Sequence, residues 1–246
     1  MVSTGLDLTQ EQILALLSKG KMELVGHFVN GSNYTFLATL YDGTTQIKAV
    51  YKPVKGENPL WDFPNRTLAK RETAAYVMCQ WLGWNFVPPT VFRKDGLLGA
   101  GSLQIYIDHD PEQHYFSLRP TEIRQLKRVA LFDLVINNAD RKGSHLILDA
   151  QHRLWLIDHG LCFNTEDKLR TVIWNFAGET IPKELLGDLE RSLSALPRDA
   201  ELFTLLHPYI TIAEIKALER RVAYLLSHPV FPFPPVDRRS YPYPPL

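Results

Sequence analysis

The chain has 246 residues and a formal net charge of zero, with 27 basic and 27 acidic side chains. Hydrophobic residues make up 45% of it and charged residues 22%, a globular composition that suits one large domain or two smaller lobes. The charge balance argues against a protein that binds nucleic acids mainly through phosphate contacts, because such proteins carry a clear basic excess.

The sequence also indicates the cellular compartment in which the protein is expected. No apolar run approaches the roughly 20 residues needed to cross a bilayer, and the first residues lack the basic and apolar stretches of a secretory signal. Two cysteines, Cys79 and Cys162, are too few for a disulfide framework or a four-ligand zinc site. We therefore expect a soluble, cytoplasmic protein without a transmembrane segment.

The first hundred residues are predicted to be rich in β-strands. Thr9 and Gln12 have the spacing of a helix capping box, and Asp42-Gly43 is a hairpin signal between two strand-like runs. The predicted elements are a helix that ends near Gly20, strands at 22–29, 34–41 and 46–52, a helix at 67–82, and strands at 90–93 and 102–107.

From residue 121 the pattern becomes helical. Apolar residues recur at helical spacing over 121–136. Two short apolar runs, 146–148 and 154–157, flank a polar turn in the pattern of a β-hairpin. Beyond Phe163 the chain is predicted to be mostly helical, with helix starts near Pro182 and at the capping box of Thr211 and Glu214.

This order predicts two lobes. Residues 1–107 would form a small β-rich lobe with one main helix, and residues 108–228 a larger helical lobe with one hairpin, joined near 108–120. Two lobes favour a ligand cleft between them.

The last segment, 229–246, holds seven of the 17 prolines and cannot continue a helix or a central strand. We predict an extended conformation. Such a segment could dock a partner as a polyproline strand, could lie along its own domain, or could be disordered.

Two aspartates have the spacing of a phosphoryl-transfer site. Asp140 lies in the polar loop before the hairpin, and Asp158 begins an Asp-His-Gly turn after it. Each alone is more often a turn residue. Kinases have these features in a fixed order: a loop aspartate, a metal ligand five residues later, a hairpin and then Asp-x-Gly. Asp158 would hold a metal ion, for which carboxylate oxygen suits magnesium, and Asp140 would orient or deprotonate the acceptor.

The β-rich half offers groups for binding phosphates. Lys52 ends a strand and Glu72 lies in the next helix, 20 residues later. Alone they fit a solvated strand end and a surface helix pair, but together they match the lysine–glutamate pair that grips the phosphates in kinases. Gly31, Ser32 and Asn33 form the turn that would cover the phosphates. That turn lacks a GxGxxG motif, and an ordinary hairpin turn is the alternative.

With these residues in place, the sequence resembles the phosphatidylinositol 3-/4-kinase superfamily. It looks most like the type II phosphatidylinositol 4-kinase branch and uncharacterised bacterial relatives. The matching stretches are residues 50–53, 71–76 running on to 87–90, 101–107, 131–141 and 157–163. They follow in order and cover about residues 22–165.

The resemblance implies an α+β, protein-kinase-like fold of two lobes and a use for each matching residue. Lys52 would bind the phosphates of ATP with Glu72 as its partner, and Ile107 would line the adenine pocket. Asp140 would be the catalytic aspartate and Asp158 a ligand of Mg2+ or Mn2+.

His145 departs from the pattern, because the family normally has a metal-binding asparagine five residues after the catalytic aspartate. An imidazole suits manganese or zinc better than magnesium, so His145 would change the metal preference, grip phosphate, or have no ligand role. His159 is predicted to be a packing residue.

The resulting hypothesis is an ATP-dependent kinase that phosphorylates a hydroxyl group. The acceptor is predicted to be a protein or a small molecule, with a lipid head group as a further possibility, because Lys168 and Arg170 are the only basic candidates near it. Two alternatives stay open: a pseudokinase that binds nucleotide as a switch, and a nucleotidyl transferase on the same fold.

Overall fold

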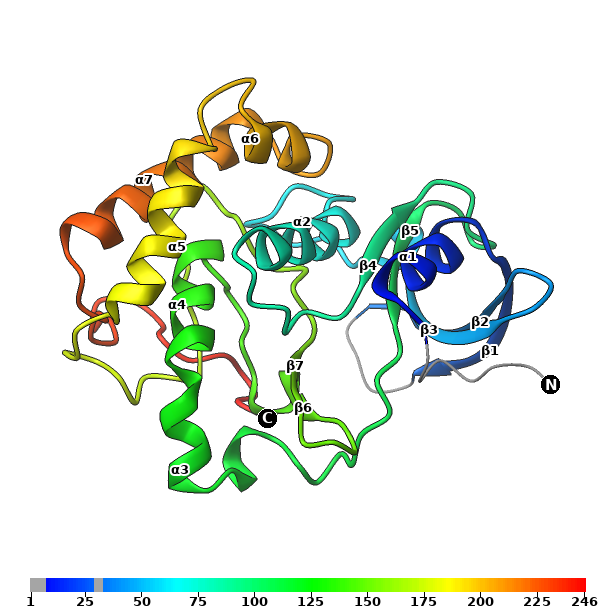
Figure 1. Cartoon of the computed structure of the whole chain (residues 1–246), viewed down its shortest axis with the longest axis horizontal. Helices are drawn as coiled ribbons and strands as arrows, with labels where there is room; N and C mark the ends of the chain where they lie inside the picture. The colour runs from blue at the N-terminus through cyan, green and yellow to red at the C-terminus, as the bar shows by residue number, and fades with distance from the viewer. Residues whose placement is uncertain (1–7, 29–32) are drawn as a thin grey trace.

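A five-stranded sheet with one helix on its face forms the smaller lobe (Figure 1). The computed structural model describes residues 8–28 and 33–246. The sheet is antiparallel, and its strands in spatial order are β1 (Lys21–Phe28), β2 (Thr35–Tyr41), β3 (Gln46–Pro53), β5 (Gly101–Ile105) and β4 (Thr90–Arg93). Helix α1 (Gln10–Lys19) begins at the capping box of Thr9 and Gln12 that the sequence predicts.

Strand β3 separates a hydrophobic core from the cleft. Successive side chains of a strand point to opposite faces. Ala49 and Tyr51 are buried in the core that Leu16 and Leu17 of α1 share with the sheet. Lys52 therefore points to the opposite face, where it meets helix α2 (Leu68–Trp81).

Helix α2 lies between the sheet and the helical lobe (Figure 1). Its apolar residues, including Ala75 and Met78, belong to the same buried cluster as the helices that follow. Arg71 of α2 forms a buried ion pair with Glu214 and donates a hydrogen bond of 2.6 Å to the Cys162 carbonyl. These contacts fix α2 to the larger lobe and keep its cleft-facing side in one place.

The larger lobe is mostly helical and carries one small hairpin. Its helices are α3 (Pro120–Ile123), α4 (Lys127–Ile136), α5 (Lys183–Ser194), α6 (Glu201–Leu206) and α7 (Ile212–Ser227), and its strands are β6 (Leu146–Leu148) and β7 (Leu154–Leu156). The part of the chain that the structure describes also contains four short 3-10 helices, at Val54–Gly56, Tyr115–Ser117, Arg124–Leu126 and Gly143–His145.

Two predicted helical stretches differ in the structure. The run 121–136 is interrupted by the 3-10 turn Arg124–Leu126, because apolar residues three apart fit both kinds of helix. Residues 164–182 form no helix. Their apolar side chains are buried, but the backbone bonds to other segments: the Thr171 amide, for example, donates to the Ser240 carbonyl (3.1 Å).

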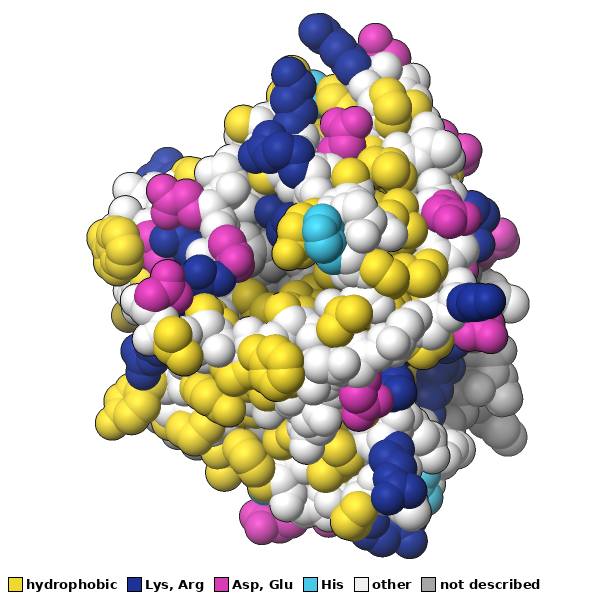
Figure 2. All heavy atoms as spheres, turned by 90° about the vertical axis from the view of Figure 1, so that its left-hand side faces the viewer, with side chains coloured by type: hydrophobic (Ala, Val, Ile, Leu, Met, Phe, Trp, Pro, Cys, Tyr) yellow, Lys and Arg dark blue, Asp and Glu magenta, His cyan; other side chains and the backbone are white. Residues whose placement is uncertain are grey.

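Segment 229–246 is extended, as predicted, and lies along the larger lobe. Phe231 is buried against Phe176, with ring centroids 5.8 Å apart. Hydrophobic side chains gather over the middle and lower part of the face shown in Figure 2. In segment 229–246, Phe233, Val236 and Tyr243 are exposed.

Candidate active site

Lys52 stands at the centre of the candidate site. Its ammonium Nζ lies 2.5 Å from Glu72 Oε1 on α2 and 2.9 Å from Asp158 Oδ1. Burial alone would lower the pKa of Lys52, but the carboxylates of Asp158 and Glu72 outweigh it and raise that pKa above its ordinary value. Lys52 is therefore a permanent cation placed between two carboxylates from different parts of the chain.

Glu72 ties the lysine to the Asp-His-Gly turn. The Glu72 side chain is buried, and its Oε2 accepts a hydrogen bond of 2.9 Å from the His159 backbone amide. The same carboxylate thus holds Lys52 with one oxygen and the turn with the other. Gly160 of this turn faces α2, and a Cβ at that position would lie 3.4 Å from the Leu68 Cβ.

Asp158 follows β7 with a left-handed backbone conformation, φ 61°. A non-glycine residue in this conformation is uncommon and is held by its surroundings. The Lys52 charge holds the pKa of the Asp158 carboxyl well below its usual range. Its second oxygen, Oδ2, lies 3.4 Å from His145 Nε2.

His145 is a buried, neutral imidazole beside that carboxylate. Burial lowers the pKa of His145 to about 4, so the ring is uncharged at neutral pH. A neutral ring nitrogen and a carboxylate oxygen at this separation can both bind one divalent ion. In residues 8–28 and 33–246, no group of three or more His, Cys, Asp or Glu side chains is placed to hold a metal. Further ligands of such an ion would be phosphate oxygens and water.

Asp140 lies in the loop between α4 and the hairpin, half-buried at the same cleft. Burial raises the pKa of its carboxyl to about 6, and the positive charge of Lys142 opposes this rise. Lys142 Nζ lies 3.7 Å from Asp140 Oδ2. A carboxylate with a pKa near 6 is suited to accept a proton at neutral pH.

A buried ion pair that the sequence reasoning did not identify supports this loop. Arg141 and Asp133 have no exposed surface, and three hydrogen bonds of 3.0–3.1 Å join the guanidinium to the carboxylate. Arg141 Nη1 also donates to the Ile157 carbonyl at 3.0 Å, directly before Asp158. The pair therefore links both aspartate loops. The available signal was an aspartate within the apolar run 129–136 of α4.

A cleft of about 400 Å3 is lined by Lys52, Glu72, Asp140, His145 and Asp158. Of the predicted site residues, the structure brings Lys52, Glu72, Asp158, His145, Asp140, Ile107 and Asn33 to this cleft. Gly31 and Ser32 lie outside the described residues. The role of each of these residues in binding or catalysis stays a prediction.

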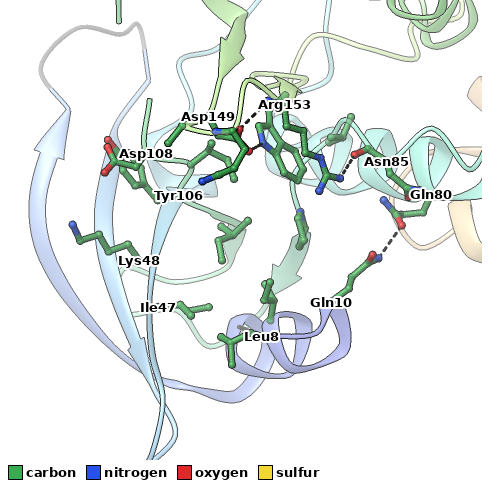
Figure 3. A pocket seen from close by; sticks show the side chains of 18 of the residues that line it. Leu8, Gln10, Ile47, Lys48, Gln80, Asn85, Tyr106, Asp108, Asp149 and Arg153 are labelled. Carbon is green, nitrogen blue, oxygen red and sulfur yellow. Dashed lines mark hydrogen bonds between the residues drawn. The ribbon is translucent and has the colours of Figure 1, made fainter. Parts of the chain in front are cut away.

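A second cavity, of about 930 Å3, borders the same connection between the lobes (Figure 3). Residues 105–107 line both cavities. In the larger one, Arg153 donates a hydrogen bond of 2.8 Å to the Asn85 carbonyl, and Gln10 donates one of 2.8 Å to Gln80. Neither Asp140 nor Asp158 lines it. The two aspartates that are predicted to act in catalysis and metal binding therefore lie at the smaller cleft.

The fold around this cleft is protein-kinase-like: a β-sheet lobe with its helix, followed by a helical lobe. The crystal structure of the Golgi casein kinase with Mn/ADP bound matches with a TM-score of 0.61 at 17% identity, over 89% of this chain and 75% of that one. The hydra Fam20 structure with sugar matches with a TM-score of 0.60 at 16% identity, over 91% and 88%. The Helicobacter pylori proinflammatory kinase CtkA gives 0.54 at 10% identity, over 87% and 94%.

Sequence comparison places the chain in a family. It is 37% identical to protein Rv2133c of Mycobacterium tuberculosis over 99% of both chains, and it belongs to the family of that protein. Phosphatidylinositol 4-kinase gamma 4 of Oryza sativa subsp. japonica is 28% identical over 124 residues, which are 43% of this chain and 22% of that protein. The likeness to phosphatidylinositol kinases is thus partial. No family model matches the chain. Among residues 8–28 and 33–246, no helix is both long and apolar enough to span a membrane.

Proposed function

We propose that this protein is an ATP-dependent phosphotransferase that moves the γ-phosphate to a hydroxyl group. The observation that carries the proposal is the placement of Lys52 between Glu72 and Asp158, at a cleft that also contains Asp140. A cation fixed by one carboxylate, beside a second carboxylate that can take a metal ion, is the arrangement that holds nucleotide phosphates in kinases.

Each residue has a chemical role in this proposal. Lys52, fixed by Glu72, neutralises charge on the phosphates that are not transferred. Asp140 accepts the proton of the attacking hydroxyl and aligns that oxygen with the γ-phosphorus. Ile107 contributes an apolar wall for the base. Catalysis rests on positioning and electrostatic stabilisation, because the transferred group needs no covalent intermediate with the protein.

Asp158 and His145 are the residues that would hold Mg2+ or Mn2+. Their carboxylate oxygen and ring nitrogen lie 3.4 Å apart, and the imidazole is neutral at neutral pH. A divalent ion bound there supplies charge neutralisation for the phosphate oxygens. The structure of the Golgi casein kinase holds Mn and ADP. This supports the proposal that the present protein binds a divalent metal ion together with a nucleotide.

The acceptor in this proposal is a protein or small-molecule hydroxyl. Lys168 and Arg170 are the basic residues that the sequence offers for a phosphorylated lipid head group. Asp62 lies 3.4 Å from Lys168 and 3.6 Å from Arg170, and Glu166 lies 3.2 Å from Lys168, so two carboxylates compensate the two positive charges. A phosphoinositide head group would need basic side chains that are free to bind its phosphates. Because Lys168 and Arg170 are already paired, the structure supports a protein or small-molecule acceptor instead.

One observation favours a second function, a nucleotide-binding module without turnover. His145 stands where kinases of the resembling family have a metal-binding asparagine. Binding and turnover separate the two functions. The phosphotransferase shows an ATP-dependent rise in melting temperature together with ADP release. The module shows the rise alone under both Mg2+ and Mn2+, and no rise with either metal rejects both functions.

The pH dependence of turnover follows from Asp140. Its carboxyl has a pKa of about 6, and only the carboxylate accepts a proton, so kcat is expected to fall as pH decreases through about 6. Lys142→Ala removes a positive charge that lowers this pKa, and the midpoint should move to higher pH. The pH profile of kcat for both proteins measures this. An unchanged midpoint in the variant would show that another group titrates.

His145→Asn tests the metal preference. Asparagine supplies an oxygen ligand, which suits Mg2+, whereas imidazole nitrogen suits Mn2+ better. The variant is therefore expected to raise the ratio of Mg2+-supported to Mn2+-supported turnover by about tenfold, the change produced by about 1.4 kcal/mol of ligand preference. Initial rates with each metal at saturating ATP measure the ratio. Equal ratios in the two proteins would mean that His145 is not a ligand.

A further inference from the structure

Segment 229–246 lies along residues 167–181, and its first part pairs with them in an antiparallel direction, with a bridge between Thr180 and Val230. It begins with the Pro229 carbonyl accepting from the Ile181 amide (2.8 Å), and the Phe231 carbonyl accepts from the Gly178 amide (2.8 Å). Further on, Arg238 forms an ion pair with Asp167. The stretch 165–181 follows Asp158, so the proline-rich segment supplies partners to the part of the chain next to the candidate site.

The end of this segment reaches the Asp140 loop. The Gly143 amide donates a hydrogen bond of 2.8 Å to the Pro245 carbonyl. Gly143 is buried, and a Cβ there would lie 2.6 Å from Phe116 and 3.5 Å from Leu246. Gly143 therefore packs tightly against Phe116 and is in ordinary van der Waals reach of Leu246, three residues from Asp140.

The same segment is also connected to the Asp140 loop by hydrogen bonds through Thr171. The Ser240 carbonyl accepts from the Thr171 amide at 3.1 Å and from Trp174 Nε1 at 3.2 Å. On either side of Thr171, the Arg170 carbonyl accepts from the Arg141 amide (3.0 Å), and the Val172 amide donates to the Arg141 carbonyl (3.1 Å). Ser240 thus holds the strand-like stretch that in turn holds Arg141, the neighbour of Asp140.

We propose that segment 229–246 is a positioning element of the phosphotransfer site, acting through Gly143 and Thr171 on the loop that carries Asp140. The catalytic part of this inference rests on the proposed phosphotransferase function. The segment makes no contact with Lys52 or Glu72 among the hydrogen bonds and ion pairs of the described residues. It therefore affects the acceptor side of the site and leaves nucleotide binding unchanged.

The test uses the full-length chain with residues 241–246 replaced by six glycine and serine residues, which removes the prolines and the Tyr241–Trp174 ring contact. Misplacing a reactive group by about 1 Å can cost about a hundredfold in rate. We expect kcat to fall by about 10- to 100-fold, with the KM for ATP and the ATP-induced melting shift unchanged. Amide hydrogen exchange at Gly143 and Thr171 should become faster.

Two further variants keep the test interpretable. Val236→Ser changes a fully exposed side chain of the same segment and should match the unaltered protein in every readout. Arg238→Ala removes the contact with Asp167 and should give the same kcat and exchange changes in weaker form, should the larger replacement fail to fold.

Hydrogen exchange separates this proposal from the proposed function. If the unaltered protein shows no turnover with either metal, the phosphotransferase is rejected, and exchange at Gly143 still decides whether the segment holds the loop. Unchanged exchange at Gly143 in the replaced protein would overturn the positioning role. So would a loss of ATP binding in parallel with kcat, which would indicate a general structural role.

Discussion

Asp140→Asn is expected to lower kcat by about 10²- to 10⁴-fold, the usual contribution of a positioned general base. Asparagine keeps the size of the side chain and loses the ability to accept the hydroxyl proton. ATP binding should be preserved, because Asp140 takes no part in the ion pairs of Lys52 with Glu72 and Asp158. Steady-state kinetics give kcat, and the melting shift with ATP reports binding.

Two controls sharpen this measurement. Lys52→Met removes the charge that the proposed mechanism places against the phosphates, so it should weaken ATP binding, which Asp140→Asn should not. Asp110→Asn changes an aspartate whose side chain only accepts a local amide hydrogen bond in an exposed turn, and it should leave kcat unchanged. If Asp140→Asn retained more than about a third of the original kcat, Asp140 would not be the base that this mechanism requires.

Arg141→Met is expected to destabilise the protein by about 3–5 kcal/mol, the usual cost of leaving one member of a buried ion pair without its partner. Asp133 would keep only the hydrogen bonds from the Asn138 side-chain amide (3.0 Å) and the Thr171 hydroxyl (3.2 Å). Urea unfolding followed by circular dichroism measures the loss. A loss below about 1 kcal/mol would contradict a structural role for the pair.

The double variant Asp133→Leu/Arg141→Met separates stability from activity. Replacing both charges with apolar side chains commonly restores much of the stability. It does not replace the hydrogen bond from Arg141 Nη1 to the Ile157 carbonyl (3.0 Å), which fixes the backbone before Asp158. We therefore expect near-normal unfolding together with low turnover. Recovery of turnover along with stability would show that Arg141 serves the fold alone.

The kinase-like fold could be predicted from the sequence because its signals are local and ordered. The alternation of β3 places Lys52 opposite Ala49 and Tyr51, and the hairpin between Asp140 and Asp158 has a clear apolar pattern. These features need only neighbouring residues, and the structure brings Lys52, Glu72 and Asp158 together in space. What these residues do stays a prediction.

Features that depend on distant residues could not be predicted. Arg71 and Glu214 are 143 positions apart, and no periodicity links them. The stretch 164–182 has helical spacing of apolar residues, but the amides of residues 170–172 bond to the carbonyls of Asn138, Arg141 and Ser240 and not to preceding residues of the same stretch. Likewise, proline content shows that segment 229–246 is extended, but its docking depends on partners such as Gly143 and Thr171, which are far away in the sequence.

The most direct test of the phosphotransferase proposal is the identity of the nucleotide products. Purified protein is incubated with ATP and Mg2+ or Mn2+, beside Asp140→Asn, with its own hydroxyl groups and water as the acceptors of the γ-phosphate, and the nucleotides are separated by chromatography. The proposal predicts ADP as the product, with its formation strongly reduced in the variant. Formation of AMP and pyrophosphate would identify nucleotidyl transfer, and an absence of ATP binding with both metals would contradict the nucleotide site itself.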